Sequence, residues 1–338
     1  MMTSIPATAI NRRRILASGV ALTATVAVSA PNIVRAATRN LALAHQWQVD
    51  HPIQTACEAI KKQVEERSSG ALGIDIFPAG QLGTGKDMVQ QVVDDSLDLT
   101  IDGPGIVGLH QQPLSLFDAP FVARDWEHMK RMLASDWARE QYAEAARNRN
   151  LQIFGDQWYY GRRHFTTTST PLMKPDDVKG LKIRVPEVPH FVDMINALGG
   201  SPTPMALPDV YLSLQTGVID GQENPLTVFE SQKFSEVQDY IALTGHIINP
   251  EYAIASANMW NSLSEDERTI LIEAFNAGGK INDDLIFGQE DSLATKFESE
   301  GVTITEPDVP AFQEAMAPVH AKYESVWGPG VLAELQEL

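Results

Sequence analysis

The stretch from Asn40 to Ile101 alternates between two hydrophobic patterns, and this alternation restricts the fold more than any other feature of the chain. Patterns typical of strands lie at 40–44, 72–77 and 97–101, and patterns typical of helices lie between them at 53–68 and 87–96. Strand, helix, strand, helix, strand is the rhythm of a parallel sheet covered by helices. In such sheets ligands bind beyond the carboxyl ends of the strands. The sequence therefore predicts an α/β fold with a ligand cleft at those strand ends.

Three residues with polar or aromatic side chains follow the first and third of these strands. Gln46 and Trp47 come just after the first strand, and Asp102 comes just after the third. Their positions make all three candidates for lining the cleft. Ordinary strand-end polarity or packing at the rim is the alternative for each of them.

Two short strands later in the chain each end in a polar side chain that a proline follows. Arg184 lies in the run Leu181–Val185 before Pro186, and Asn224 lies directly before Pro225. Proline cannot donate to a strand ladder and restricts the residue before it, so Pro186 constrains Val185, next to Arg184, and Pro225 constrains Asn224 itself. A guanidinium fork together with an amide could form a carboxylate clamp. A solvated or salt-bridged strand end is the alternative for Arg184.

Three phrases of the sequence carry a family resemblance: KIRVP at 182–186, SPTPMALPDVYLSLQTGVIDGQENP at 201–225 and KFSEVQDYIALTGHI at 233–247. They resemble the solute-binding proteins of tripartite ATP-independent periplasmic (TRAP) transporters, DctP type, and the similarity extends over nearly the whole mature chain, including 77–83. The resemblance implies a two-domain periplasmic-binding-protein fold (Venus flytrap) with a long interdomain helix and a solute buried between the domains. It also implies that Arg184 binds the substrate carboxylate and that Asn224 assists.

A capping box formed by Ser264 and Glu267 opens a helical pattern that reaches nearly to Glu300. Unbroken, this helix would be about 50 Å long, so we expect it to run along both domains. We expect Gly278–Gly279 to bend it.

The crossing segments between the domains are expected near Tyr160 and Asn249, with Gly161 as a hinge. We expect domain I to comprise 37–160 and 250–289, and domain II to comprise 161–249 and 290–338. Further patterns predict a strand at 151–154 and helices at 125–148, 229–240 and about 310–327.

Four more residues are candidates for contact with the solute. Glu187 would accept hydrogen bonds from substrate hydroxyls and repel a second carboxylate. Leu207 stands where some relatives of the family place an aromatic side chain. Arg163 is either a second carboxylate ligand or a structural arginine. Trp158 either stacks on the solute or fills the seam between the domains.

The residue types at Thr166–Thr170 bear on which solute the chain binds. Family members that bind sialic acid carry a further arginine about here, whereas this chain offers only hydroxyls, which argues against sialic acid as its solute. Together with Glu187 and Leu207, this favours a hydroxylated monocarboxylate, such as an aldonate or a uronate, over a C4-dicarboxylate.

Several other classes of function find little support in the sequence. The run Gly80–Lys86 resembles a phosphate-binding loop, but Asp87 stands where a Ser or Thr must ligate Mg²⁺, so we interpret it as a turn that leads into a helix. The chain has no metal-ligand spacing and no nucleophile elbow, its eight histidines do not cluster, and we expect no cofactor, no metal and no enzyme activity. An enzyme with Asp102 and Glu187 as paired carboxylates is the competing class, and a sensory module that reports to a separate receptor is a third.

The first 36 residues resemble an export signal, with Arg12–Arg14, a mildly apolar run and a cleavage site at Val34–Ala36. The adjacent arginines favour the twin-arginine route over an ordinary Sec signal. We therefore expect a periplasmic protein cleaved near Ala36. The only cysteine is Cys57, so no disulfide can form within the chain.

Charge restricts the partners of the exported chain. The formal charge of the whole chain is −18, and loss of the four arginines of the signal leaves 22 basic and 44 acidic side chains, a net charge of −22. Such a surface repels nucleic acid and anionic lipid. An anion-binding protein with this balance must gather positive charge inside a cleft. We expect a monomer whose protein partners are the separate small and large membrane subunits of a TRAP transporter.

Overall fold

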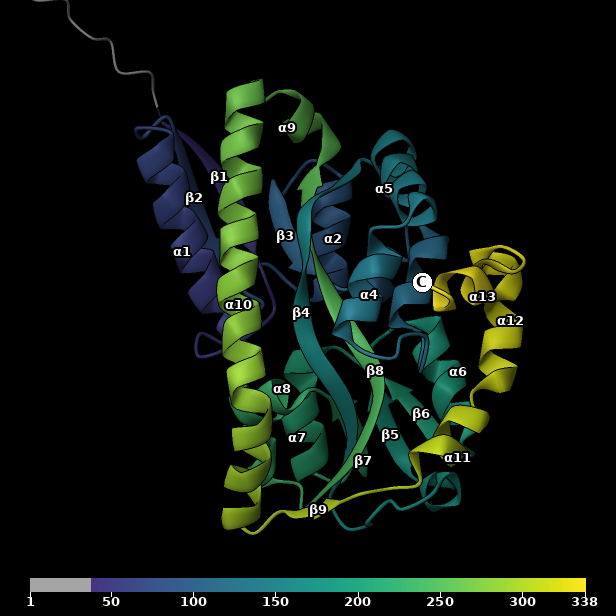
Figure 1. Ribbon diagram of the computed structural model, residues 1–338. Helices are drawn as coiled ribbons and strands as arrows, with labels where there is room; N and C mark the ends of the chain where they lie inside the picture. Colours follow the sequence, from purple (N-terminus) through teal and green to yellow (C-terminus); the bar gives the residue numbers. More distant parts are fainter. Residues whose placement is uncertain (1–37) are drawn as a thin grey trace, which may run out of the picture. The chain divides into compact units, whose positions relative to one another are not determined.

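A mixed sheet of nine strands organises residues 38–338, which are the residues described by the computed structural model (Figure 1). The strand order is β2-β1-β3-β8-β4-β7-β5-β6, with β9 beside β8. The strands are β1 (Arg39–Ala44), β2 (Leu72–Phe77), β3 (Leu99–Asp102), β4 (Leu151–Thr167), β5 (Lys182–Val185), β6 (Ser201–Pro204), β7 (Gly221–Asn224), β8 (Tyr240–Ser256) and β9 (Thr303–Thr305).

The first half of the sheet has the predicted strand–helix rhythm. Strands β1, β2 and β3 are parallel, and helices α1 (Pro52–Arg67) and α2 (Gly85–Val93) connect them. Thr84 caps α2, and its side chain and that of Asp87 form a capping box. This cap confirms that the glycine-rich run is a turn that leads into a helix.

The long strands β4 and β8 pair antiparallel and connect the two halves of the sheet. Each has 17 residues, so the prediction of a strand limited to 151–154 was wrong, because the apolar residues Trp158–Tyr160 continue the strand pattern. The pairing register shifts at three places, between Phe154 and Trp158, between Tyr159 and Gly161, and between Arg163 and Phe165. Gly161 has a φ of +123°, which favours glycine.

The second half contains β5, β6 and β7 and the helices around them. Helix α6 (Pro189–Ala197) follows β5, α7 (Val210–Gln215) precedes β7, and α8 (Leu226–Ser231) follows it. Pro186 and Pro225 end β5 and β7 as the sequence predicts. The helix predicted at 229–240 does not form as one piece. Instead, α8 gives way to the 3-10 turn η4 (Phe234–Glu236), and β8 begins at Tyr240.

Two other predicted helices are divided. The helix at 125–148 is α4 (Trp126–Leu133) followed by α5 (Asp136–Arg149), because the Ser135 side chain accepts from the Ala138 amide and starts a new helix. The predicted last helix is α11 (Val309–Glu314) and α12 (Ala317–Trp327), followed by α13 (Val331–Gln336). The remaining short elements are α3 (Pro104–Val107), η1 (Gln112–Asp118), η2 (Pro175–Val178), η3 (Leu207–Asp209) and α9 (Ala257–Asn261).

Helix α10 (Glu265–Ser299) is the long helix expected from the sequence, and it runs along both halves of the sheet (Figure 1). Its N-terminus has the predicted capping box of Ser264 and Glu267. It packs on α1 and β4 and, further along, on α8 and β9. The helix continues without a break through Gly278 and Gly279, where a Cβ would lie 2.5 Å from Ile60 and 2.4 Å from Trp158. These glycines therefore allow close packing, and the bend stays a prediction.

Three clusters of buried apolar side chains form the core. The largest combines side chains of α1, β1 and α10 with side chains of α7 and α8, so it joins both halves. The second lies around α2, α4 and α5 and includes Trp327 from α12, and the third lies around β5 and α6. The described residues, 38–338, thus belong to one unit. The division into domains I and II stays a prediction, and the export signal lies outside the described residues.

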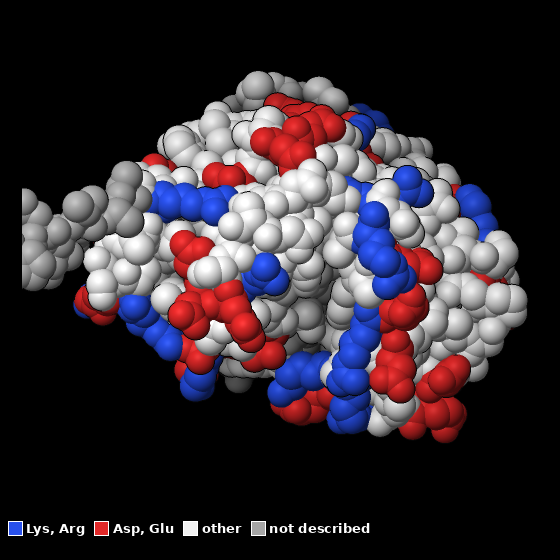
Figure 2. Space-filling view, turned by 90° about the horizontal axis from the view of Figure 1, so that it is seen from above, with Lys and Arg blue, Asp and Glu red and all other residues white. Residues whose placement is uncertain are grey.

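The surface carries both signs of charge. On the face in Figure 2, basic side chains lie singly or in short rows flanked by acidic ones, with wide uncharged areas between them. Within residues 38–338, no helix combines the length and the apolar character needed to span a bilayer.

Candidate functional site

A cavity lies where strands from both halves of the sheet end. It encloses about 660 Å³ of empty space, part of it open to solvent. Its walls include residues at or just beyond the carboxyl ends of β1, β3, β5, β6 and β7, with β4 and β8 contributing from the middle of the sheet. The lining side chains that bear on function are Gln46, Lys86, Asp102, Asp118, Tyr160, Arg163, Arg184, Glu187, Phe191, Leu207, Asn224, Asn249 and Glu251.

Arg184 is a buried cation that lacks a counter-ion. It is 4% exposed, and its Nε and Nη2 both donate to the Met205 carbonyl, at 3.0 and 2.8 Å. A guanidinium has five N–H donors, so three of them meet no acceptor in the described part of the chain. No ion pair to Arg184 occurs there either. Burial lowers the pKa of Arg184 to about 10, which leaves it charged at neutral pH.

Arg163 is also buried, but its charge is already paired. Its Nε and Nη2 donate to the two carboxylate oxygens of Glu223, at 2.6 and 2.7 Å, and Nη1 donates to Asn249 Oδ1 at 3.0 Å. Burial opposes ionisation of Glu223, yet the Arg163 charge outweighs it and lowers the pKa of Glu223 to about 2. This geometry favours the structural interpretation of Arg163, although its side chain lies in the cavity wall.

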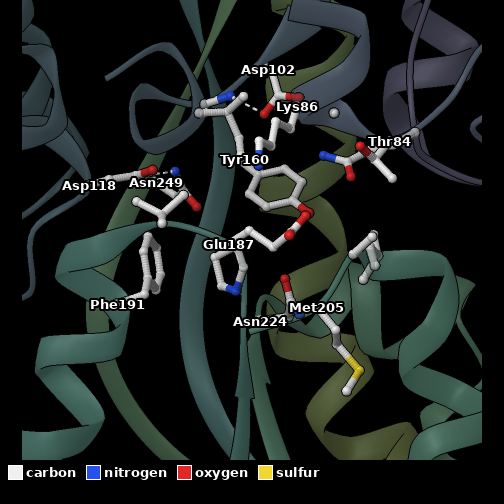
Figure 3. A pocket seen from close by; sticks show the side chains of 18 of the residues that line it. Thr84, Lys86, Asp102, Asp118, Tyr160, Glu187, Phe191, Met205, Asn224 and Asn249 are labelled. Atoms are coloured by element: carbon white, nitrogen blue, oxygen red, sulfur yellow. Dashed lines mark hydrogen bonds between the residues drawn. The ribbon is translucent and has the colours of Figure 1, made fainter. Parts of the chain in front are cut away.

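The second half of the sheet supplies three more predicted residues. Asn224 ends β7, is 3% exposed, and donates from Nδ2 to Gln222 Oε1. Glu187 is exposed at the cavity edge, and Leu207 follows β6 in the wall (Figure 3). The fold therefore brings Arg184, Asn224 and Glu187 to one cavity, as the strand-end argument predicts.

The first half supplies two polar candidates, Gln46, which follows β1, and Asp102, which ends β3. Gln46 and Asp102 both line the cavity, and both lie against Gly85 at the start of α2. A Cβ on Gly85 would be 2.2 Å from Asp102 Oδ2, so glycine is needed for this approach. Asp102 Oδ1 accepts from the Gly103 amide at 2.9 Å.

Two tryptophan candidates lie outside the cavity wall. Trp47 is 1% exposed, and its Nε1 donates to the Tyr160 hydroxyl at 2.9 Å, so it contacts a lining residue rather than the cavity. Trp158 packs against Phe275 and Gly279 of α10. The structure thus favours the seam-filling interpretation of Trp158.

The segment Thr166–Thr170 is not part of the cavity wall, although an argument about sialic acid rested on it. It contains the end of β4, where the Thr168 hydroxyl donates to the Val237 carbonyl. The hydroxyls of this segment therefore do not line the cavity.

Two carboxyl groups of the cavity were not predicted as site residues. Asp118 ends η1, where its Oδ2 accepts from the Gly105 amide at 2.7 Å and its Oδ1 accepts from Asn249 Nδ2 (Figure 3). Glu251 lies in the middle of β8 and is 3% exposed. Each is a charged residue next to or within an apolar run, Leu114–Phe117 or Ile247–Ala255, and this is the signal that could have identified them.

Comparison with known proteins gives the family. The sequence model of the bacterial extracellular solute-binding protein family 7 (DctP) matches residues 43–326. The chain belongs to this family. The DctP-family relatives include the sialic acid-binding periplasmic protein SiaP of Vibrio cholerae, which is 35% identical over 92% of this chain and 96% of its own.

Solved structures of DctP-family proteins share the fold. A TRAP periplasmic solute-binding protein of Actinobacillus succinogenes with bound L-galactonate has a TM-score of 0.84 and 31% identity, over 88% of this chain and 98% of its own. Another, from a Sulfitobacter species with bound β-D-galacturonate, has a TM-score of 0.83 and 29% identity, over 88% of this chain and 98% of its own. The expected two-domain periplasmic-binding-protein fold, with its long helix, and the expected TRAP family are therefore confirmed.

Proposed function

We propose that this chain captures a hydroxylated monocarboxylate, such as an aldonate or a uronate, and that Arg184 and Asn224 hold its carboxylate. The observation that carries this proposal is the charge of Arg184, which is buried in the cavity wall and, within the described part of the chain, has no counter-ion and three N–H donors without an acceptor. Burying a cation without a partner costs free energy. A solute carboxylate that forms two hydrogen bonds with the guanidinium group of Arg184 would offset that cost.

The rest of the cavity suits the hydroxylated part of such a solute. Glu187, Asp102 and Glu251 offer oxygens that accept from hydroxyls, while Glu187 would repel a second carboxylate. Relatives with bound L-galactonate and β-D-galacturonate support this class. Sialic acid, named for the Vibrio cholerae relative, is also a hydroxylated monocarboxylate and is a second candidate.

We further propose that the chain is exported to the periplasm by the signal in residues 1–36 and delivers its solute to separate TRAP membrane subunits. The twin arginines and the family of the chain support this. The chain has no catalytic role in this proposal, since its family consists of solute-binding proteins.

A thermal-shift screen tests the solute class. A solute that binds only the folded state raises the melting temperature with its concentration. We expect L-galactonate, D-galacturonate or sialic acid to raise the melting temperature more than succinate does at equal concentration. A shift with succinate alone would replace the monocarboxylate by a C4-dicarboxylate.

A further inference from the structure

Three carboxyl groups of the cavity wall lack a cation as partner. Asp102, Asp118 and Glu251 are 3%, 5% and 3% exposed, and no ion pair to any of them occurs in residues 38–338. They come from β3, η1 and β8. Figure 3 shows Asp102 and Asp118 on the side of the cavity away from Asn224 and Met205. Arg184 donates to the Met205 carbonyl, so Asp102 and Asp118 lie away from the Met205 side of the cavity, and Glu251 interacts electrostatically with both of them.

Two oxygens of this acid cluster have no hydrogen-bond partner in the described chain. They are Asp102 Oδ2 and Glu251 Oε2, and both are fully buried. Buried polar atoms almost always have a partner, so each of these oxygens needs a group to hydrogen-bond with, and ordered water or a hydroxyl of the solute can supply it. Both side chains line the cavity, which is where a solute could supply that donor.

The surroundings oppose ionisation of all three groups at once. Burial and the charge of Asp118 raise the pKa of Asp102 to about 7, although the Gly103 amide opposes this. Burial raises the pKa of Asp118 to about 7 as well, against Arg163, and burial with the two neighbouring carboxyls raises that of Glu251. The charge of Arg163 is shared with Glu223, so it offers the cluster only partial compensation.

Other titratable groups face the cluster from the elements packed against it. Tyr160 of β4 and Tyr252 of β8 are neutral phenols whose pKa values burial raises. His190 of α6 is buried, which lowers its pKa to about 4, so it is uncharged at neutral pH. Lys86 of α2 lines the same cavity but forms no ion pair with the cluster. In the described residues no set of three acidic, His or Cys side chains could hold a metal ion.

We propose that Asp102, Asp118 and Glu251 form a proton-holding cluster that keeps at least one proton at neutral pH and selects solutes whose far end is uncharged and hydroxylated. This rests on the proposed function, because Arg184 must hold the carboxylate at the other end. A protonated carboxyl both donates and accepts, and so does a hydroxyl, so the two are complementary. A second carboxylate would repel the cluster, and an ammonium group would require it to ionise.

Three solutes that differ only at the far carbon test the selection. L-Galactonate carries CH₂OH there, galactarate carries a carboxylate, and 6-amino-6-deoxy-L-galactonate carries an ammonium group. By calorimetry at pH 7 we expect L-galactonate to bind at least about tenfold more tightly than either of the others. Tighter binding of galactarate or of the amino compound would overturn the proposal.

The pH dependence of binding tests whether the cluster must be protonated for the solute to bind. If the cluster must be protonated to bind the hydroxylated end, the affinity for L-galactonate falls between pH 6 and pH 8.5, by at most about tenfold per pH unit for each proton taken up. The double variant Asp102→Asn and Glu251→Gln should flatten this slope. Glu187→Gln removes an exposed carboxyl group of the same cavity and should leave the slope of affinity against pH in place. A slope that persists in the double variant would contradict the proposal.

Infrared spectroscopy of the solute-free protein separates this inference from the proposed function. The wild type should show absorption from protonated carboxyl groups at pH 7, and the double variant should lose part of it. If none of the three solutes binds, the proposed substrate is wrong, while the infrared titration still decides the state of the cluster. Absence of protonated carboxyl absorption at pH 7 would overturn the inference even if L-galactonate binds.

Discussion

At the scale of single residues, the cavity contrasts two buried arginines that have different surroundings. Arg163 has its counter-ion in Glu223, whereas Arg184 has the Met205 carbonyl and no counter-ion among residues 38–338. Truncation of one partner of a buried pair leaves the other charge uncompensated, which costs far more than loss of an exposed pair. Loss of Glu223 should therefore lower the stability of the protein through Arg163. A bound solute should instead supply the counter-ion of Arg184.

We expect Glu223→Gln to lower the free energy of unfolding at pH 7 by about 3–5 kcal/mol, because it leaves Arg163 buried without a counter-ion. The pKa of Glu223 is lowered in the folded state, so its stabilising effect is present above the unfolded pKa and disappears as the pH falls toward about 2. Urea unfolding at pH 7 therefore measures the full effect. Glu230→Gln, which removes one side of the exposed pair with Lys296, is the control and should cost about 1 kcal/mol or less. Equal stability of the two variants would contradict the assignment of Arg163.

The sequence predicted the site residues whose location follows from strand ends and prolines. It missed the site residues whose location follows from tertiary packing. Arg184, Asn224, Gln46 and Asp102 line the cavity because each ends or follows a parallel strand. Glu251 comes from the middle of β8, and its position depends on how β8 pairs with β3 and β4, which no local pattern encodes. For the same reason the burial of Trp47 and Trp158 could not be predicted from their position along the chain.

At the scale of elements, α10 was predicted almost to its ends, and the long strands were not. A capping box and a sustained helical pattern are local signals, so Glu265–Ser299 could be recognised. β4 and β8 contain register shifts that interrupt the strand pattern, so their full length emerges only from their pairing with each other. The break between α4 and α5 was overlooked because Ser135 also fits inside a helical pattern.

Two glycines of α10 offer a matched test of its packing. Gly279→Ala should lower the free energy of unfolding by about 1–3 kcal/mol, because the new Cβ would be 2.4 Å from the buried Trp158 ring. Gly288→Ala is the control: it is exposed, has no atom within 4 Å of a new Cβ, and should raise stability by about 0.4–1 kcal/mol. Urea unfolding of both variants gives the comparison, and a stabilising Gly279→Ala would show that the glycines serve flexibility rather than close packing.

At the scale of the whole molecule, the cavity receives side chains from both halves of the sheet, so a solute that contacts both would favour a closed arrangement. In the described residues, β4, β8 and α10 continue from one half to the other, and α12 packs on α6 of the second half and on η1 of the first. The register shifts around Gly161 mark a place where the crossing strands could bend. The domain boundaries and the closing motion are predictions from the sequence.

Small-angle scattering tests closure. We expect a smaller radius of gyration with saturating solute than without it, and no change for Arg184→Ala at the same solute concentration. Saturation is established by calorimetry on the same sample. An unchanged radius for the saturated wild type would reject closure and leave the binding assignment intact.

The central claim is that Arg184 binds the carboxylate of the solute, and calorimetry with a matched pair of solutes tests it most directly. The pair is the sugar acid that gives the largest thermal shift and its neutral counterpart, in which CH₂OH replaces the carboxylate. We predict that the wild type binds the acid and not the neutral sugar, and that Arg184→Ala weakens binding of the acid by about 2–5 kcal/mol, which is at least thirtyfold. Near-native affinity of Arg184→Ala, or equal binding of the neutral sugar by the wild type, would contradict the claim.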